Sequence, residues 1–435
     1  MKSKVLLPMK ILCLYIFITI IMFLAGPVRY DNVDNIAVAS FMLLFILIAS
    51  LFYYFGIQQK INLQRANHIW SYKKILHYSL IYTFFLQLLL VIQNSMVHGV
   101  SLSSFIGANY FQQMAEAYSD MEVINTPASW LMSYTGWVKL IALIGASYFP
   151  IRQQPKVDRV LYYSIIVLII LNVVLFVGSQ KQLVDIFAYM LVPTIIKLSK
   201  SGKKIKVSHK VKVIILVVGV AFMLGSVVSA RYDLWKARYN SSGSLGYGIH
   251  IDYNNFLYKI FPGVIASSIA MLDSYLTQGY RGLSLCLKLP FKWAYGMGSS
   301  FKLMNDISRW FHIPIQKLEV SYPVRMQETF GVPAYAHWHS IFPWLASDFT
   351  WIGAIFVVGI FVYYWGKAWK ELRYLNSFAA VMLFTQLTIF MAYIPCNNQL
   401  FQTRESIMST MAICIIWFLY HGNRESSEED YYFEE

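Results

Sequence analysis

Continuous apolar runs separated by polar links dominate the chain. A helix rises about 1.5 Å per residue, so roughly 20 apolar residues cross a hydrocarbon core of about 30 Å. Because these runs are unbroken rather than alternating, they predict helices and not the strands of an outer-membrane barrel. The sequence therefore predicts an all-α polytopic membrane protein with about ten transmembrane helices. We place these spans at 8–26, 36–56, 77–96, 130–149, 160–178, 182–198, 212–229, 347–366, 377–395 and 405–421.

One long stretch, 230–346, interrupts this pattern and predicts a large loop of short helices. Its apolar part at 264–272 is too short to span a membrane and predicts an interfacial or re-entrant helix. We expect a turn and a second short helix to follow. The chain then divides into an N-terminal bundle of about seven spans (1–229), the loop (230–346), about three further spans (347–421) and an acidic tail (422–435).

The distribution of Lys and Arg predicts the orientation of the chain. With the N-terminus inside, the cytoplasmic segments hold 21 of these residues and the opposite short loops hold three. Since cytoplasmic loops carry an excess of Lys and Arg, both termini are predicted to be cytoplasmic and the long loop external. The net charge of +14 is then explained by topology, and no nucleic-acid partner is expected.

Arginines near the start and middle of the long loop are candidate anion contacts. Arg231 follows directly on the seventh predicted span, and Arg238 lies seven residues further on. Arg281 stands in the segment SYLTQGYRGLSL. Guanidinium groups offer planar, bidentate donors that suit phosphate. Arginines at a membrane interface also serve as anchors, so both interpretations stay open for these residues.

Two histidines and an aspartate crowd the end of the loop, in HWHSIFPWLASDF. His337 or His339 would suit a general base, because imidazole titrates near neutral pH. A third metal ligand at a recognisable spacing is missing, so we expect no metal site. Asp348 either orients a base or caps the next helix, and the cap is the favoured interpretation.

Polar residues also occur at membrane depth and near the external ends of spans. Lys139 lies midway along the fourth span, where a charge requires a cavity or a partner, and Asp185 is a candidate partner. Gln180 and Lys181 in the turn GSQK, with Arg404 at the start of the last span, are candidate substrate contacts. Such residues would equally form helix-packing ion pairs or belong to a proton-coupled transporter.

Several other chemistries lack their sequence signatures. The four cysteines show neither CxxC nor zinc-like spacing, so no disulfide framework is predicted. The glycines of KWAYGMGSS are not followed by GK[ST] and follow no predicted strand. We therefore expect no nucleotide and no cofactor.

In its architecture and in several local segments, the chain resembles the bacterial O-antigen and capsule repeat-unit polymerases, the Wzy family. The segments are SARYD, SYLTQGYRGLSL, PFKWAYGMGSS, HWHSIFPWLASDFTWIGA and the GSQK turn. The resemblance implies a class C glycosyltransferase-like fold in the bacterial inner membrane. It implies metal-independent joining of undecaprenyl-pyrophosphate-linked oligosaccharide units on the outer face, beside a flippase and a chain-length regulator.

Under that hypothesis Arg231, with Arg238, Arg281 or Arg404, would bind the pyrophosphate, and His337 or His339 would lie near the acceptor hydroxyl. Two alternatives remain. An O-antigen ligase would use the same donor with a different acceptor, and a transporter or flippase would move lipid-linked oligosaccharide without joining it.

Overall fold

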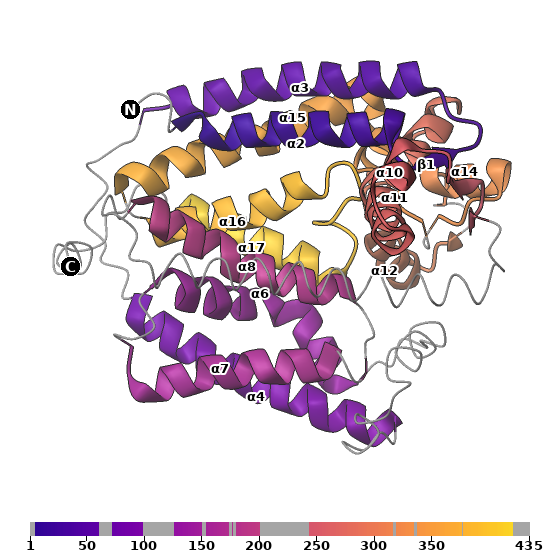
Figure 1. Cartoon of the computed structure of the whole chain (residues 1–435). Coiled ribbons are helices and arrows are strands. Elements are labelled where there is room, and N and C mark those ends of the chain that lie inside the picture. Colours follow the sequence, from indigo (N-terminus) through magenta and orange to yellow (C-terminus); the bar gives the residue numbers. More distant parts are fainter. Residues whose placement is uncertain are drawn as a thin grey trace. The chain divides into compact units, whose positions relative to one another are not determined.

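A computed structural model describes residues 5–60, 72–98, 126–149, 154–173, 176, 180–200, 243–315, 319–334, 337–375 and 377–420. Within these ranges the chain is mostly helical and forms two compact units (Figure 1). Unit 1 contains 1–59, 231–370 and 387–404, and unit 2 contains 60–230, 371–386 and 405–435. The predicted division into N-terminal bundle, long loop, final spans and acidic tail stays a prediction.

Three long apolar helices form the body of unit 1: α2 (Leu7–Ala25), α3 (Asn35–Gln58) and α15 (Phe342–Leu375). They lie side by side in Figure 1. Helices α3 and α15 run parallel, since the Lys370 Nζ near the end of α15 donates to the Gln59 carbonyl after α3 at 2.9 Å. Helix α2 runs opposite to both, since the Tyr53 hydroxyl near the end of α3 donates to the Val5 carbonyl before α2. These directions agree with the predicted order of spans 1, 2 and 8.

The buried and exposed faces of α3 are both apolar. Val38, Met42, Phe45, Ala49 and Tyr53 are buried at spacings of three and four residues, as expected for one face of a helix. The opposite face exposes further large apolar residues: Ile36, Leu43, Leu47 and Leu51. A helix that is apolar on all sides is typical of a membrane span, where lipid covers the outer face.

The remaining elements of unit 1 gather at one end of these helices, and we call them the cap. They are β1 (Val28–Tyr30), β2 (Ser244–Gly246), β3 (Ile249–Ile251), α10 (Phe256–Ile260), α11 (Gly263–Leu287), α12 (Phe301–Phe311) and α14 (Tyr322–Phe330). Figure 1 shows them around α11 beside the β1 end of α2. The segment 387–404, with the end of α16 (Phe378–Ala392), completes unit 1.

Unit 2 is built mainly from α4 (Tyr72–His98), α6 (Pro127–Tyr148), α7 (Lys156–Asn172), α8 (Gln180–Lys200) and α17 (Arg404–Tyr420, from Glu405 on). Hydrogen bonds fix the relative direction of the first three. Asn94 donates to Asn172 at 2.8 Å near the C-terminal ends of α4 and α7, so these two helices are parallel. The Gln93 side chain accepts from the backbone of Ala128 at 3.0 Å, so α6 runs antiparallel to α4.

The described helices coincide with nine of the ten predicted spans, and the seventh, 212–229, lies outside the described residues. By length and composition, α2, α3, α4, α8 and α15 are long and apolar enough to cross a membrane, and α16 is a shorter apolar helix. The coarse prediction of a helical chain with membrane-spanning helices is therefore supported, whereas a total of ten spans stays a prediction.

Two predictions about the long loop are wrong. The segment predicted as a short helix, a turn and a second helix is one helix, α11, of 25 residues. Gly279 and Gly282 suggested a turn, but both lie within the helix, where the missing side chain permits close packing. Asp348 does not cap the next helix, because α15 is kinked at Thr350 and the Thr350 hydroxyl, not Asp348, accepts from the Gly353 backbone where the helix resumes.

Candidate functional site

A small antiparallel sheet, in the order β1–β3–β2, brings the link between α2 and α3 into the cap. Val28 pairs with Ile251, Arg29 with His250 and Tyr30 with Ile249. The Asp31 backbone N–H extends this pairing by donating to the Gly248 carbonyl at 2.9 Å. Residues more than 200 positions apart thereby form one surface.

Helix α11 packs closely against the segment that carries the histidines. A Cβ on Gly282 would lie 2.6 Å from the Cα and 2.9 Å from the Nδ1 of His339. A Cβ on Gly279 would overlap the Pro395 carbonyl oxygen and lie 2.6 Å from the Ser340 nitrogen. Only glycine permits this approach, so these two positions fix where the two residues between them, Tyr280 and Arg281, are placed.

Arg281 is a buried cation that forms no ion pair with any residue that the structure describes. It is 6% exposed, and its Nε has no hydrogen-bond partner. A Cβ on Gly248 would lie 2.9 Å from the Arg281 Nη2 and 3.0 Å from the Asp31 Oδ2, so both side chains lie beside this glycine. Burial lowers the pKa of Arg281, and the nearby charge of Asp31 opposes that effect. An incompletely satisfied buried guanidinium is costly and well suited to receive an anion.

His337 is half-buried and lies edge-on to the ring of Tyr247, with centroids 4.8 Å apart. Burial, and then the positive charge of Arg281, lower the pKa of His337 to about 4. The imidazole is therefore neutral at pH 7, and the causes that keep it neutral also make it a weaker base than an exposed histidine. Of the two predicted histidines, this is the one with an accessible side chain.

His339 is 1% exposed and is held in place by its surroundings. Its Nε2 donates to the Ala334 carbonyl at 2.6 Å, while its Nδ1 is buried without a hydrogen-bond partner. Burial is the main cause that lowers the pKa of His339 to about 4, and the charge of Arg281 adds to it. Such a ring, packed against Gly282, is better placed to position the cluster than to meet a substrate directly.

Asp31 and His250 form the rim of this cluster, with 3.0 Å between Oδ2 and Nε2 and about half of each side chain exposed. Asp31, His250 and Tyr247 were not among the predicted site residues. No local motif marks them, because they meet only through the pairing of β1 with β3 and the turn before β3. We call Arg281, His337, His339, Asp31 and Tyr247 the cap cluster.

Arg404, predicted to bind pyrophosphate, lies in a two-bond ion pair with Asp306 of α12. Its Nε donates to Oδ2 at 3.0 Å and its Nη2 to Oδ1 at 2.6 Å. The Asp306 side chain is 6% exposed. Paired in this way, the Arg404 guanidinium holds α12 against the end of the segment 387–404, within unit 1.

Asp348 connects α15 to the glycine-containing segment KWAYGMGSS. Its Oδ1 accepts from the Gly296 backbone at 2.8 Å, and its Oδ2 has no hydrogen-bond partner. The hydrogen bond assigns Asp348 to holding that loop, and no described interaction joins it to His337 or His339.

Lys139 forms a close ion pair with Glu405, with 2.6 Å between Nζ and Oε1. The proposed pairing with Asp185 is therefore wrong. In the same unit, the Tyr189 hydroxyl donates to Gln386, which donates in turn to Thr410. These interactions form a polar track among apolar helices of unit 2.

Four predicted site residues are not placed by this geometry. Arg231 and Arg238 lie outside the described residues, and for Gln180 and Lys181 only the backbone, at the start of α8, is described.

Among the described residues no group of three or more His, Cys, Asp or Glu is arranged to hold a metal ion. Comparisons with protein-family models, with curated proteins and with solved structures gave no match to this chain.

Proposed function

We propose that the protein joins oligosaccharide units carried on a lipid pyrophosphate, as a polysaccharide polymerase of the Wzy type. The observation that carries this proposal is the cap cluster, in which a buried arginine that forms no ion pair with the described residues lies beside Asp31 and near the accessible His337. The cluster belongs to a cap at one end of three apolar helices, where a lipid headgroup and its sugars would be reached together.

In this mechanism the growing chain is the donor and a hydroxyl of a new unit is the acceptor. The bond between the anomeric carbon and the pyrophosphate oxygen breaks, and a bond to the acceptor oxygen forms. Arg281 stabilises the negative charge that develops on the leaving pyrophosphate. His337 accepts the hydroxyl proton and later releases it. His339 positions the segment, and Arg231 or Arg238 would add further positive charge.

Reconstitution tests the proposal. Purified protein in liposomes, supplied with a lipid-pyrophosphate-linked repeat unit on the accessible face, should produce products longer by whole units. Arg281→Ala should lower this rate by about 100-fold or more, the effect expected when one preorganised donor to a developing anion is lost. Gel separation of the labelled glycan measures both results.

Arg29→Ala is the matched control, because Arg29 lies in the same cap but is half-exposed and pairs with Asp252. Its loss should leave elongation unchanged, since exposed ion pairs contribute little. Full activity of folded Arg281→Ala protein would remove the cap cluster from the proposal. Transfer to a lipid A-core acceptor, in place of elongation, would identify a ligase.

A transporter of lipid-linked oligosaccharide is the second candidate, and the Lys139–Glu405 ion pair favours it. Ion pairs within membrane helices often mark translocation paths. If the transporter alternative is correct, the labelled lipid should cross the liposome bilayer without becoming longer, and Lys139→Ala should slow that crossing while Arg281→Ala should not.

A further inference from the structure

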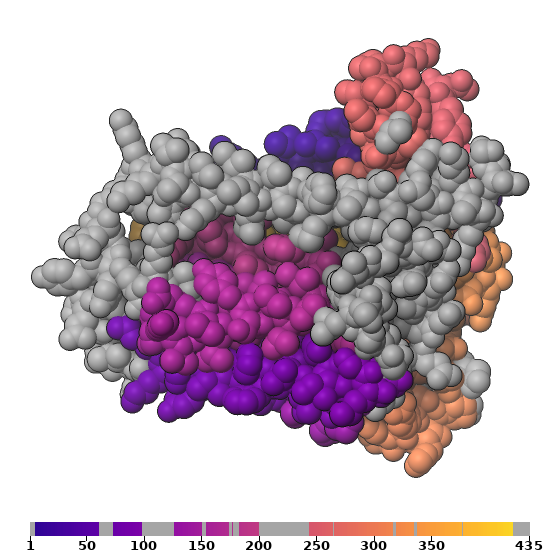
Figure 2. Space-filling view, turned by 60° about the horizontal axis from the view of Figure 1, so that its bottom comes forward, coloured from indigo at the N-terminus to yellow at the C-terminus, as the bar shows by residue number. Residues whose placement is uncertain are grey.

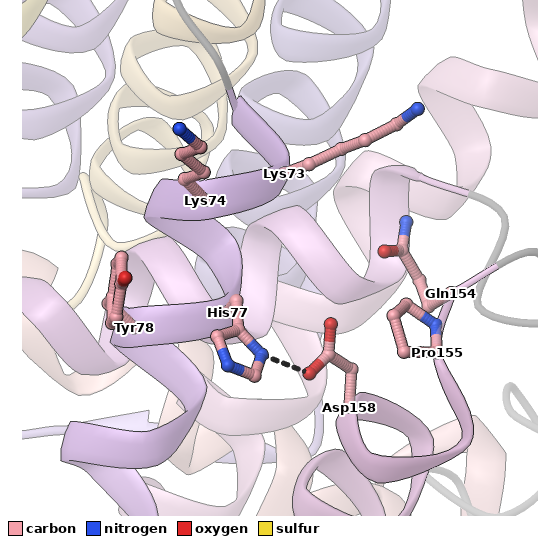
Figure 3. Close-up of a pocket in the computed structure, with 7 residues that line it drawn as sticks. All are labelled: Lys73, Lys74, His77, Tyr78, Gln154, Pro155 and Asp158. Carbon is pink, nitrogen blue, oxygen red and sulfur yellow. Dashed lines mark hydrogen bonds and ion pairs between the residues drawn. The ribbon is translucent and has the colours of Figure 1, made fainter.

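A pocket lies at the shared N-terminal ends of α4 and α7 in unit 2 and encloses about 480 Å³. Figures 1 and 2 show these two helices side by side. The residues that line the pocket, shown in Figure 3, are Lys73, Lys74, His77, Tyr78, Gln154, Pro155 and Asp158. This pocket belongs to neither the cap nor the polar track.

Positive charge predominates around this pocket. Lys73 and Lys74 provide two cations from the first turn of α4, whereas Asp158 is the sole acid among the lining residues. The Asp158 carboxylate is 3% exposed and lies 2.6 Å from the His77 Nδ1. A single carboxylate, already hydrogen-bonded to His77, leaves Lys74 without an acidic partner among the lining residues.

The parallel packing of α4 and α7 adds to this positive field. Both helices begin at the pocket, so their partially positive ends lie together, and the Pro155 that precedes α7 supplies no side-chain cap. Adjacent helix ends of the same sign repel each other, and a bound anion offsets that repulsion.

Gln154 supplies a second observation that points to a ligand. Gln154 is 9% exposed and lines the pocket. No hydrogen bond joins this amide to any part of the chain that the structure describes. A buried amide normally has a partner, and one that faces a pocket without a partner is suited to hold a ligand.

We propose that this pocket binds a phosphate group. Lys74 supplies charge, the Gln154 amide donates a hydrogen bond, and His77, oriented by Asp158, presents its other nitrogen. Lys73 opens the apolar stretch of α4, so the pocket lies at the depth of lipid headgroups. The phosphate is carried by an anionic phospholipid or is free in solution, and the two sources are distinguishable.

Native mass spectrometry of the full-length protein in detergent tests this site. Three probes are used: short-chain phosphatidylglycerol, short-chain phosphatidylcholine and inorganic phosphate. Retention of phosphatidylglycerol in preference to phosphatidylcholine supports a headgroup site, and retention of inorganic phosphate supports a soluble ligand. Equal, weak retention of all three would overturn the proposal.

Variants then locate the binding. Lys74→Gln should weaken retention of the anionic probe about fivefold, the effect of one lysine on an anionic headgroup. Gln154→Ala should weaken it as well. Lys10→Gln is the matched control, because Lys10 is an exposed lysine near the start of another apolar helix, α2. Equal losses in Lys74→Gln and Lys10→Gln would show non-specific attraction and would also overturn the proposal.

Discussion

Arg281 has the most informative environment of any single residue in the cap. Its burial costs free energy that no ion pair offsets among the described residues, yet two glycines of α11 hold the helix close to the histidine segment and thereby fix it there. Such an arrangement is typical of a binding site, because an anionic ligand would restore the missing interaction. Arg404 lies in the opposite situation, since Asp306 already satisfies it.

The acid–base behaviour of His337 gives the first prediction at this scale. Since its pKa is lowered from 6.5 to about 4, the base form persists at mildly acidic pH. Elongation should therefore continue down to about pH 5, and initial rates measured between pH 4.5 and 8 test this. His250→Gln, at the exposed rim, should leave the acidic limb unchanged. A half-maximal rate near pH 6.5 would contradict the role of His337.

The same shift affects stability. Between pH 6.5 and about 4 the unfolded chain binds a proton at this histidine and the folded chain does not. The free energy of unfolding should therefore fall as the pH falls through this window. His339, whose pKa is lowered to a similar value, acts in the same direction.

At the scale of elements, α11 is held by close contact rather than by charge. Gly282→Ala would place a Cβ 2.6 Å from the backbone of His339 and should reduce the stability of the cap by about 1–3 kcal/mol. Gly263→Ala, in the same helix with open space around it, should be neutral or slightly stabilising. Thermal unfolding of both variants measures the difference, and equal melting temperatures would show that the contact is not tight.

The attachment of α12 provides another prediction at this scale. Asp306→Asn leaves the Arg404 guanidinium partly buried and poorly paired, which should cost about 3 kcal/mol. Lys302→Gln is the control, because Lys302 is exposed and lies 4.0 Å from the same carboxylate, so its effect should stay below about 1 kcal/mol. The rate at which a protease cleaves α12 measures the loss of stability in each variant. Equal cleavage rates of the two variants would exclude a structural role for the ion pair.

The elements also show what sequence patterns predict well. Continuous apolar runs located α2, α3, α4 and α15 because burial in lipid depends on local composition. The strands β1 and β3 contain three residues each and exist only through a pairing across more than 200 positions, so no local pattern predicts them. Only part of the cap cluster was predicted, because its remaining members are brought in by this same long-range pairing. His337, His339 and Arg281 have suggestive neighbours in sequence, whereas Asp31 and Tyr247 do not.

For the whole molecule, the proposed chemistry depends on which side of the membrane each end of the helices occupies. Within unit 1, α2 runs opposite to the parallel pair α3 and α15, which places the cap at one end of the three helices and the N-terminus at the other. Within unit 2, the parallel helices α4 and α7 place Lys73 and Lys156 at one common end. The bias in Lys and Arg predicts that the cap is external and that this lysine-bearing end is cytoplasmic.

Cysteine labelling of intact cells tests this orientation. The chain suits the method, because Cys286 and Cys396 are buried and the other two cysteines lie within apolar helices. Trp293→Cys, at a cap residue that is 56% exposed, should react with a membrane-impermeant maleimide in intact cells. Lys156→Cys should react only after permeabilisation. The reverse pattern would place the cap in the cytoplasm, where the proposed donor does not present its sugars, and would exclude polymerisation on the outer face.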